Sequence, residues 1–357
     1  MNAPANLGSV VVRGADLEDA ADRARIDAFV RAHDRGTPFH LTSWGVAVAR
    51  GCGQTAHCLV AERRDGMVAG ILPLTEVRSA LFGRAMVSAG FAVGGGVLAV
   101  DDRAAIALME AGWALAEAAG CPSVELRGPA PADPAWTATA GTYVNFAAPL
   151  ADSDEAQLLA IPRKQRAEIR RSLGFDLAVE TGSGPRDRAA HYAVYSESVR
   201  NLGTPVFPRA LFGAVLDAFG DDADILTVRK DGAPIASVLT LYHRGIAMPY
   251  WGGGTHSARR WRANDHLYFA LMRHARNRGC TRFDFGRSKL GTGAYAFKKN
   301  WGFEPEPLTY AVRTADGAAP RDVNPLSPKY RLQVAAWQKL PLWLANRIGP
   351  AIARGLG

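Results

Sequence analysis

A glycine-rich stretch near the C-terminal end of the chain combines acidic, basic and aromatic side chains: residues 283–303 read FDFGRSKLGTGAYAFKKNWGF. The pattern predicts a buried strand that ends near Gly286 and continues into a loop. Asp284 would lie on the face of this strand opposite its phenylalanines, where an acid at a strand end can act as general base for an amine. A salt bridge to a neighbouring arginine is an equally good interpretation of Asp284.

Arg287 and Lys289 come directly after this strand. Both suit a phosphate group, Arg as a bidentate fork and Lys as a point charge, and the glycines of the loop allow close approach to its backbone. Tyr295 is a further candidate contact for a substrate, whereas Trp301 and Phe303 are expected to serve packing. The loop therefore predicts an anion site beside a candidate proton acceptor.

The net charge of +8 is concentrated in two segments. Residues 161–175 carry five Arg/Lys and one Glu, and residues 258–289 carry nine Arg/Lys and two Asp, an excess larger than the net charge of the whole chain. Such clustering suits an anionic ligand or partner, for example a phosphate, a nucleotide, tRNA or a lipid headgroup. A solvated basic surface is the alternative.

The first basic segment is predicted to form a helix that begins after Ala160. Arg163, Arg166 and Arg170 recur along it at spacings of three and four residues and therefore share one face. This face is a candidate grip for a diphosphate acceptor, a bilayer surface or RNA. A solvated helix between domains is the alternative.

Three softer candidates for substrate contacts lie further along the chain. Asn201 and Thr204 belong to a turn-rich loop after a predicted helix, where ligand contacts concentrate. Tyr250 precedes three glycines at 252–254 and is a candidate wall of a cleft. A strained strand bend is the simpler use of those glycines.

An internal repeat organises the chain. In each half a strand, an Asp-Gly turn and a second strand are followed by a strand that runs into three glycines, an amphipathic helix, a Gly-Cys stop and a buried strand. The shared order predicts a duplicated ββαβ unit, and hence an α/β (α+β) fold with two domains, mixed sheets and a cleft between or beside them. The repeat positions are Asp-Gly 65–66 and 231–232, glycines 94–96 and 252–254, and Gly-Cys 120–121 and 279–280.

The repeat sets the expected domain boundaries. The N-terminal domain would span 1–155, with its closing strand and exit linker in 131–155, and the C-terminal domain would span 156–320. A tail at 321–357 mixes Trp, Leu and Arg/Lys around two prolines. It is expected either to lie on a membrane surface or to pack back on the domain.

The composition argues against several other classes of protein. No apolar run approaches the ~20 residues of a membrane span, and no secretory signal is evident, so we expect a cytoplasmic protein, peripheral at most to the inner face of the membrane. The sequence contains neither a CxxC pair nor a metal-binding motif, so we expect no metal and reduced, mostly buried thiols at the four cysteines. The cysteines are Cys52, Cys58, Cys121 and Cys280.

Several long strings resemble one family: IPRKQRAEIRRSLGF, NLGTPVFPRALF, PYWGGGT, FDFGRSK and FKKNWGFEPEPL. They resemble the FemAB-related proteins associated with exosortase and PEP-CTERM exopolysaccharide systems, and the similarity covers nearly the whole chain. The resemblance implies two tandem domains of the GNAT type, the N-acyltransferase fold. FemAB-type proteins move an amino acid from aminoacyl-tRNA to the amine of a peptidoglycan precursor, and related members transfer other acyl groups.

The resemblance also assigns roles within the loop. In FemAB-type transferases a Phe-Lys pair lines the acyl-transfer channel, and the matching residues are Phe297 and Lys298. Lys298 would stabilise charge on the transferring carbonyl or on the leaving group, a contribution that is often the largest in catalysis. The first half of the chain lacks both the basic loop and this pair, so we place the chemistry in the second half.

Two departures from the family leave the acyl donor open. The chain has no extended heptad region to form the long helical arm of the tRNA-using type. The glycine-rich phosphate loop of coenzyme A users is also missing, and at its position WRANDHLYF offers Asn264 and Asp265 as a helix N-cap. Asn264 is kept as a candidate substrate contact. The donor is therefore either acyl-CoA or aminoacyl-tRNA, and no permanently bound cofactor is expected.

The leading hypothesis is an acyl- or aminoacyltransferase that acts on an amine, or less readily a hydroxyl, of an exopolysaccharide or cell-envelope precursor. Its acceptor would be a small-molecule or lipid-linked saccharide, and tRNA is a candidate partner as donor, whereas DNA is not. The alternative is a non-catalytic tandem-GNAT protein that binds a polysaccharide precursor or a membrane synthase. An RNA-binding protein would rest on basic charge alone, because interleaved aromatic platforms are lacking.

Overall fold

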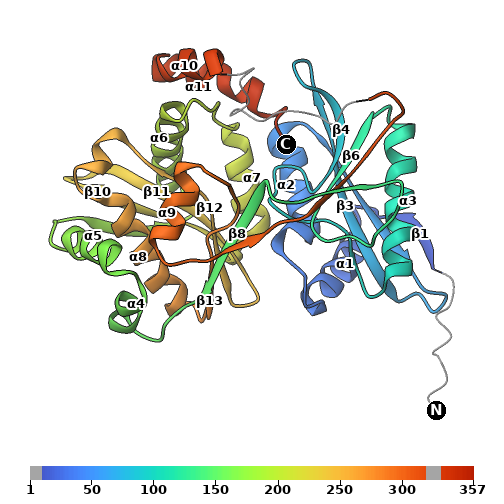
Figure 1. The fold of residues 1–357 in the computed structure, drawn as a ribbon, viewed down its shortest axis with the longest axis horizontal. Helices are drawn as coiled ribbons and strands as arrows, with labels where there is room; N and C mark the ends of the chain where they lie inside the picture. Colours follow the sequence, from blue (N-terminus) through green and yellow to red (C-terminus); the bar gives the residue numbers. More distant parts are fainter. Residues whose placement is uncertain (1–9, 319–330) are drawn as a thin grey trace. The chain divides into compact units, whose positions relative to one another are not determined.

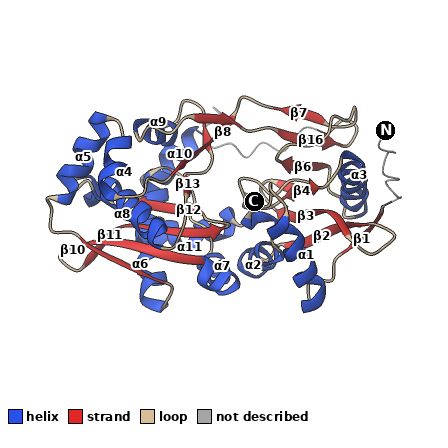
Figure 2. Ribbon diagram, turned by 90° about the horizontal axis from the view of Figure 1, so that it is seen from below, coloured by secondary structure: helices blue, strands red, loops and turns tan. Residues whose placement is uncertain are grey.

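The computed structural model describes residues 10–318 and 331–357, which form two compact units (Figure 1). Among the described residues, the first unit contains 10–139, 309–318 and Gly355–Gly357, and the second contains 140–308 and 331–354. Each unit is built on one mixed eight-stranded sheet with helices packed on it (Figure 2). The predicted α/β class with two sheet-based domains is therefore confirmed.

The sheet of the first unit has the strand order β1-β2-β3-β4-β6-β16-β7, with β5 paired to β3. Its strands are antiparallel except for β4 and β6, which run parallel. Its strands are β1 (Val11–Gly14), β2 (Thr55–Glu62), β3 (Val68–Ser79), β4 (Gly83–Ser88), β5 (Leu98–Ala99), β6 (Ser123–Arg127), β7 (Thr137–Thr139) and β16 (Tyr310–Thr314), and its helices are α1 (Ala20–Ala32), α2 (Thr42–Cys52) and α3 (Asp102–Ala118).

The sheet of the second unit repeats this topology in the order β9-β10-β11-β12-β13-β8-β14, with β15 paired to β8. Here β12 and β13 form the parallel pair. The strands are β8 (Tyr143–Pro149), β9 (Ala178–Gly182), β10 (Ala223–Lys230), β11 (Ala233–His243), β12 (Ile246–Gly254), β13 (Arg282–Asp284), β14 (Ser288–Lys289) and β15 (Pro305–Pro307). The helices are α4 (Asp154–Ala160), α5 (Arg163–Leu173), α6 (Pro185–Asn201), α7 (Arg209–Phe219), α8 (Ala263–Asn277), α9 (Gly293–Asn300), α10 (Arg331–Gln338) and α11 (Leu342–Ala353).

The local signals of the repeat take the expected structure. The Asp-Gly pairs turn β2 into β3 and β10 into β11, and helices α3 and α8 end just before Gly120 and Gly279. All four of these glycines have positive φ, between 65° and 81°, a backbone region in which other residues are strained. The four cysteines are buried free thiols, which confirms the interpretation of their spacing.

Two strands, however, cross between the repeats. β8 follows the first repeat in the sequence but pairs with β13, β14 and β15 of the second unit. β16 follows the second repeat but pairs with β6 and β7 of the first unit. The closing strand that we predicted for the first domain in 131–155 is thus wrong at β8, and the units are not the contiguous ranges 1–155 and 156–320. Sequence adjacency is only a tendency in strand pairing, because the pairing itself depends on non-local contacts.

The two glycine triplets serve different purposes. In β12, residues 252–254 let helices approach from both sheet faces, because a Cβ at Gly253 would clash with Ser198 of α6 and a Cβ at Gly254 would lie 2.6 Å from Asn264 Oδ1 of α8. Close helix packing, rather than a strained bend, explains them. The triplet at 94–96 lies in the connection after β4, which ends at Ser88. The prediction that a strand runs into the glycines is therefore wrong for the first half of the chain.

The described part of the tail packs on the second unit, where α10 and α11 contact α6. Packing on the domain is thus confirmed for residues 331–354, while the beginning of the predicted tail, 321–330, lies outside the described residues. None of the described helices has both the length and the apolar character to cross a bilayer.

Candidate functional site

Asp284 is the last residue of β13, in the second unit. Its neighbours Phe283 and Phe285 are 0% and 5% exposed in the core, so alternation along the strand turns the Asp284 carboxylate to the opposite face. Gly286 follows with φ of 71°, and its N–H donates to Asp284 Oδ1 at 2.8 Å. The predicted end of a buried strand at this position is confirmed.

Lys298 reaches the same residue, Gly286, from helix α9. Its Nζ donates to the carbonyl oxygens of Gly286 and Arg287 at 2.8 and 3.0 Å and lies 5.7 Å from the centre of the Phe146 ring. An ammonium has three N–H donors, so these two bonds leave one for a ligand. The structure thus brings Asp284, at the end of β13, and Lys298, on α9, to one residue, Gly286.

Burial perturbs both groups in the direction of their neutral forms. It lowers the pKa of the Lys298 ammonium to about 7, against the opposing effect of Asp284. Burial also raises the pKa of Asp284, although the Gly286 N–H, the Asn145 side chain and Lys298 all favour its charged form. Groups whose pKa is shifted by burial beside a charged neighbour are typical of acid–base sites.

The two basic residues of the loop lie against β8. The Arg287 guanidinium stacks over the Tyr143 ring at 4.5 Å, and Lys289 in β14 is the register partner of Tyr143. Tyr143, Asn145 and Phe146 therefore belong to the site, and sequence reasoning missed all three. Their alternating pattern indicated a strand, but that strand was assigned to the other domain.

The aromatic residues of α9 fix this helix on the core. Phe297 contacts Tyr268, Phe285 and Trp301, with ring centres 5.6 to 6.3 Å apart, and Tyr295 packs edge-on against Phe146 at 5.5 Å. Both are half-buried. They position the helix that carries Lys298, and their contact with a substrate stays a prediction. Trp301 and Phe303 are buried, as expected for packing residues.

The parallel strands β12 and β13 separate beside this cluster. Their register pairs are Ile246–Arg282 and Ala247–Phe283. Beyond them β12 continues to Gly254, while the residues after β13 turn toward β8. The β11–β12 register shifts between Leu239 and Thr240, which places Tyr250 in a β-bulge. In α/β sheets, ligands bind outside the carboxyl ends of strands where neighbours diverge. Tyr250 is therefore in a position to wall such a site.

Asn264 lies at the start of α8, but the predicted N-cap is wrong. The cap residue is Arg262, with φ of 51°, and Asn264 and Asp265 are already inside the helix. Asp265 instead accepts a hydrogen bond from Gln165 at 2.6 Å. Asn264 Oδ1 is buried beside Gly254 and has no hydrogen-bond partner among the described residues. A buried unsatisfied oxygen is unusual and suits a ligand contact.

The arginines of α5 stay outside the cluster. Arg166 donates to the carbonyl oxygens of Leu159 and Ile161 at 2.9 to 3.2 Å, so it closes the end of α4 rather than facing a substrate. Arg163 and Arg170 are exposed on a helix that packs on α8. Their binding role stays a prediction.

The loop after α6 also lies apart from the cluster. Asn201 O accepts a hydrogen bond from Gln338 of α10 at 3.2 Å, and Thr204 N donates to Val199 O at 2.9 Å. A Cβ at Gly203 would clash with Val334 of the same helix. Asn201 thus contacts a tail helix, and Thr204 bonds within its own turn. Their contact with a substrate stays a prediction.

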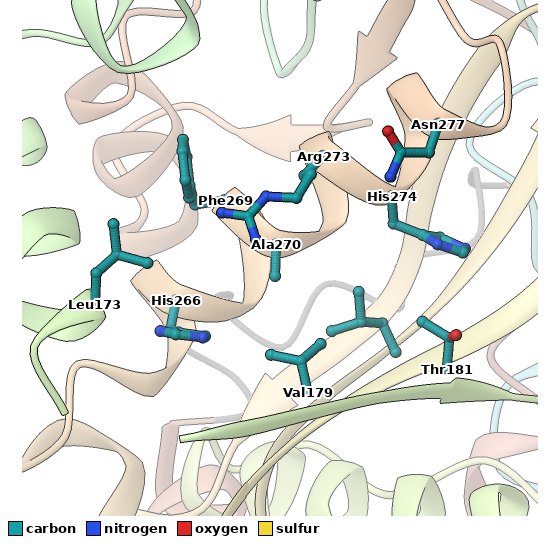
Figure 3. Close-up of a pocket in the computed structure, with 10 residues that line it drawn as sticks. Leu173, Val179, Thr181, His266, Phe269, Ala270, Arg273, His274 and Asn277 are labelled. Atoms are coloured by element: carbon teal, nitrogen blue, oxygen red, sulfur yellow. The ribbon is translucent and has the colours of Figure 1, made fainter. Parts of the chain in front are cut away.

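A further pocket of ≈ 260 Å³ lies between α8 and β9 in the second unit (Figure 3). Its main charged groups are engaged within the protein, because His274 Nε2 bonds to Asp224 at 2.7 Å and Arg273 pairs with Asp154 at 2.7 Å. The pocket contains none of the predicted site residues. The Asp284–Lys298 cluster is therefore the better candidate for chemistry.

Comparisons with known proteins agree with the fold of the two units. Residues 162–299 match the acetyltransferase (GNAT) domain family. The fold is a tandem GNAT fold. A crystal structure of FemX matches with a TM-score of 0.63 and 16% identity, over 80% of this chain and 95% of that one. No curated protein matches the chain.

Two further solved structures are similar to the chain. The C-terminal domain of a putative lysylphosphatidylglycerol synthetase from Agrobacterium fabrum matches with a TM-score of 0.56 and 16% identity, over 83% of this chain and 93% of that one. A tandem GNAT protein from the clavulanic acid biosynthesis pathway matches with a TM-score of 0.53 and 15% identity, over 87% of this chain and 100% of that one. The GNAT family match includes both Asp284 and Lys298, and it lies within the second unit.

Proposed function

We propose that the chain is an acyl- or aminoacyltransferase that acts on an amine, or a hydroxyl, of a cell-envelope or exopolysaccharide precursor. One observation carries the proposal. Asp284 and Lys298, the residues that the family resemblance and the strand-end argument single out, both bind Gly286 where β12 and β13 diverge: Asp284 accepts from its N–H, and Lys298 donates to its carbonyl oxygen. The GNAT match over 162–299 supports acyl transfer as the chemistry.

The geometry suggests how the transfer proceeds. The acceptor nitrogen bonds to the acyl carbon, and the thiol of coenzyme A or the tRNA hydroxyl leaves. Asp284, whose pKa is raised by burial, accepts the proton that the attacking amine loses, and the leaving group takes a proton in return. Lys298 stabilises the negative charge that develops on the carbonyl or on the leaving group.

The substrates follow from the same loop and from the family resemblance. Arg287 and Lys289 would hold a phosphate or diphosphate of the acceptor or donor. Acyl-CoA and aminoacyl-tRNA are both retained as donors, and the clavulanic acid relative, described without AcCoA, gives a reason to include acyl-CoA. The resemblance places the acceptor in a PEP-CTERM/exosortase-type pathway, where it would be a saccharide made at the inner face of the cytoplasmic membrane.

The first test is thermal stabilisation of the purified protein by a panel of donors and acceptors. The panel holds acetyl-CoA, longer acyl-CoAs, charged and deacylated tRNA, and UDP-sugars. We expect one activated donor to raise the unfolding temperature of the native protein. The matched control is Lys299→Ala, because Lys299 is exposed on the same helix as Lys298, and this variant should show the same shift. In Lys298→Ala the shift should shrink or disappear.

A second assay separates binding from catalysis. The donor that binds is incubated with UDP-sugars and lipid-linked saccharides, and transfer of its acyl group is followed by mass spectrometry. Transfer that is lost in Lys298→Ala and kept in Lys299→Ala supports the transferase. Acceptor binding without transfer from any donor would overturn it in favour of a non-catalytic tandem-GNAT protein.

A further inference from the structure

The tail helices use one face for packing on the second unit. Asn346 Nδ2 donates to Ser196 Oγ of α6 at 3.2 Å, and Ala345, Gly349 and Ala353 of α11 are buried. These three small residues recur every four positions, so they form a single stripe along the helix. The opposite face of α11, which carries Trp343 and Arg347, is therefore exposed.

That exposed face carries aromatic, apolar and basic side chains. Trp343 is 72% exposed, Leu332 of α10 is 79% exposed and Ile348 is 38% exposed. Arg347 and Arg354 are also exposed and follow Trp343 at spacings of four and eleven residues. Residues 331–357 contain four Arg/Lys and no Asp or Glu, so no acidic side chain of this segment offsets the charge.

A groove of ≈ 500 Å³ runs beside this face, between α11 and the start of α7. Arg209 lies on one wall, with its guanidinium 4.3 Å from the centre of the Tyr192 ring, and Arg347 and Asn346 lie on the other. Trp343 stands at the groove as well. Among the described residues, the lining contains no carboxylate, so two guanidinium groups, a phenol and an amide face one space.

We propose that α11 and this groove dock the protein on an anionic membrane surface, with a lipid phosphate held between Arg209 and Arg347 and Trp343 in the interfacial layer. Indole rings with apolar and basic neighbours favour the boundary between headgroups and acyl chains, and anionic headgroups attract basic segments that lack acids. Arginine forks match phosphate oxygens in pairs. A soluble ligand explains the groove but not the exposed Trp343, Leu332 and Ile348 beside it.

The docking surface goes beyond the transferase proposal, because a transferase with a water-soluble acceptor has no need of it. Its test uses the full chain without donor or acceptor, so it does not depend on activity. Binding is measured by sedimentation with vesicles of phosphatidylcholine alone and of phosphatidylcholine with phosphatidylglycerol. We expect binding only to the anionic vesicles, weakened by salt and little affected by soluble glycerol phosphate.

Variants locate the surface. Trp343→Ala and the double change Arg209→Glu with Arg347→Glu should each weaken vesicle binding by about tenfold or more. The matched controls are Leu81→Ala, a 68% exposed residue of the first unit, and Arg31→Glu on α1, and both should bind as the native chain does. Unfolding temperatures show that each variant is folded.

Four results would overturn the proposal. The first is unchanged vesicle binding in the α11 variants. The second is loss of binding in Arg170→Glu but not in those variants, which would assign docking to the basic helix α5. The third is equal binding to both kinds of vesicle, or none to either. If soluble glycerol phosphate competes fully, the groove is a phosphate site and the bilayer is not its partner.

Discussion

The two GNAT-like units have an acid at the same repeat position, but the neighbours of that acid differ between the units. Glu125 of β6 corresponds to Asp284 of β13, but Glu125 accepts a hydrogen bond from Arg127 Nε at 2.7 Å. Arg127 is buried and also donates to Ala89 O and Ala92 O, at 3.3 and 2.7 Å. In the first unit the acid is therefore part of a structural ion pair that ties the connection after β4 to the strand beside it.

The second unit has glycine where the first has this arginine. Gly286 stands at the position of Arg127, and the cation near the acid comes instead from Lys298, on a helix of its own. In the first unit the returning chain also closes the strand end, because Gly96 N donates to Arg127 O at 3.0 Å. The residue two positions after the acid therefore differs with the state of the strand end. It is Arg127 where the strand end is closed, and Gly286 where the pKa values of Asp284 and Lys298 are perturbed.

The largest expected effect tests which acid is catalytic. Asp284→Asn removes the proton acceptor and should lower the transfer rate by roughly 10²- to 10⁴-fold. Glu125→Gln makes the same chemical change in the first unit and should leave the rate within a few-fold. Rates measured with the donor identified by thermal shift decide the comparison. A loss of similar size in both variants would mean that the first unit also takes part in catalysis.

The next effect concerns stability. Arg127→Ala removes a donor from Ala89 O, Ala92 O and the partly exposed Glu125, so it should lower the free energy of unfolding by about 3 kcal/mol. Gly286→Ala forces alanine to φ of 71° without a clash and should cost about 1–2 kcal/mol. Denaturant unfolding of both variants gives the two values. If Arg127→Ala is as stable as the native chain, the structural role of the Glu125–Arg127 pair is wrong.

Acid should weaken the second unit through a buried histidine. His191 of α6 bonds to Ser237 Oγ at 3.0 Å, and burial lowers its pKa to about 3. At a pH between that value and the unfolded pKa of about 6.5, the histidine is protonated in the unfolded chain but neutral in the native chain. Stability is therefore complete above about pH 6.5 and falls toward acid, by about 3 kcal/mol at pH 4.

The control for this prediction is His191→Phe, which keeps an aromatic ring but cannot bind a proton. Its free energy of unfolding should fall less between pH 7 and pH 4 than that of the native chain. Parallel pH profiles for the two proteins would show that other groups cause the acid sensitivity.

The smallest effect sharpens the role of Lys298. With a pKa of about 7, its ammonium loses the proton as pH rises, so a rate that needs the cation should fall about tenfold per pH unit well above 7. Lys298→Arg keeps the charge at all working pH values and should shift this decline to higher pH. A decline at the same pH in both proteins would assign it to another group.

Much of the architecture could be predicted because its signals are local. The Asp-Gly turns, the Gly-Cys helix stops and the buried strand ahead of Gly286 depend on the φ preferences of glycine and on alternation within a few residues. The duplication followed from their shared order. The candidates Asp284 and Lys298 came from a strand end and from the family resemblance, and in the structure both bind Gly286.

Tertiary structure decided what local signals cannot carry. Only strand pairing over long sequence distances showed that β8 supplies Tyr143, Asn145 and Phe146 to the second unit and that β16 closes the first. Only burial, a sum over the whole environment, draws the pKa of Lys298 to about 7, and only packing engages Arg166 with the end of α4. The reason is physical: backbone preferences are fixed by a residue and its neighbours, whereas pairing, burial and electrostatics depend on groups that meet only when the chain has folded.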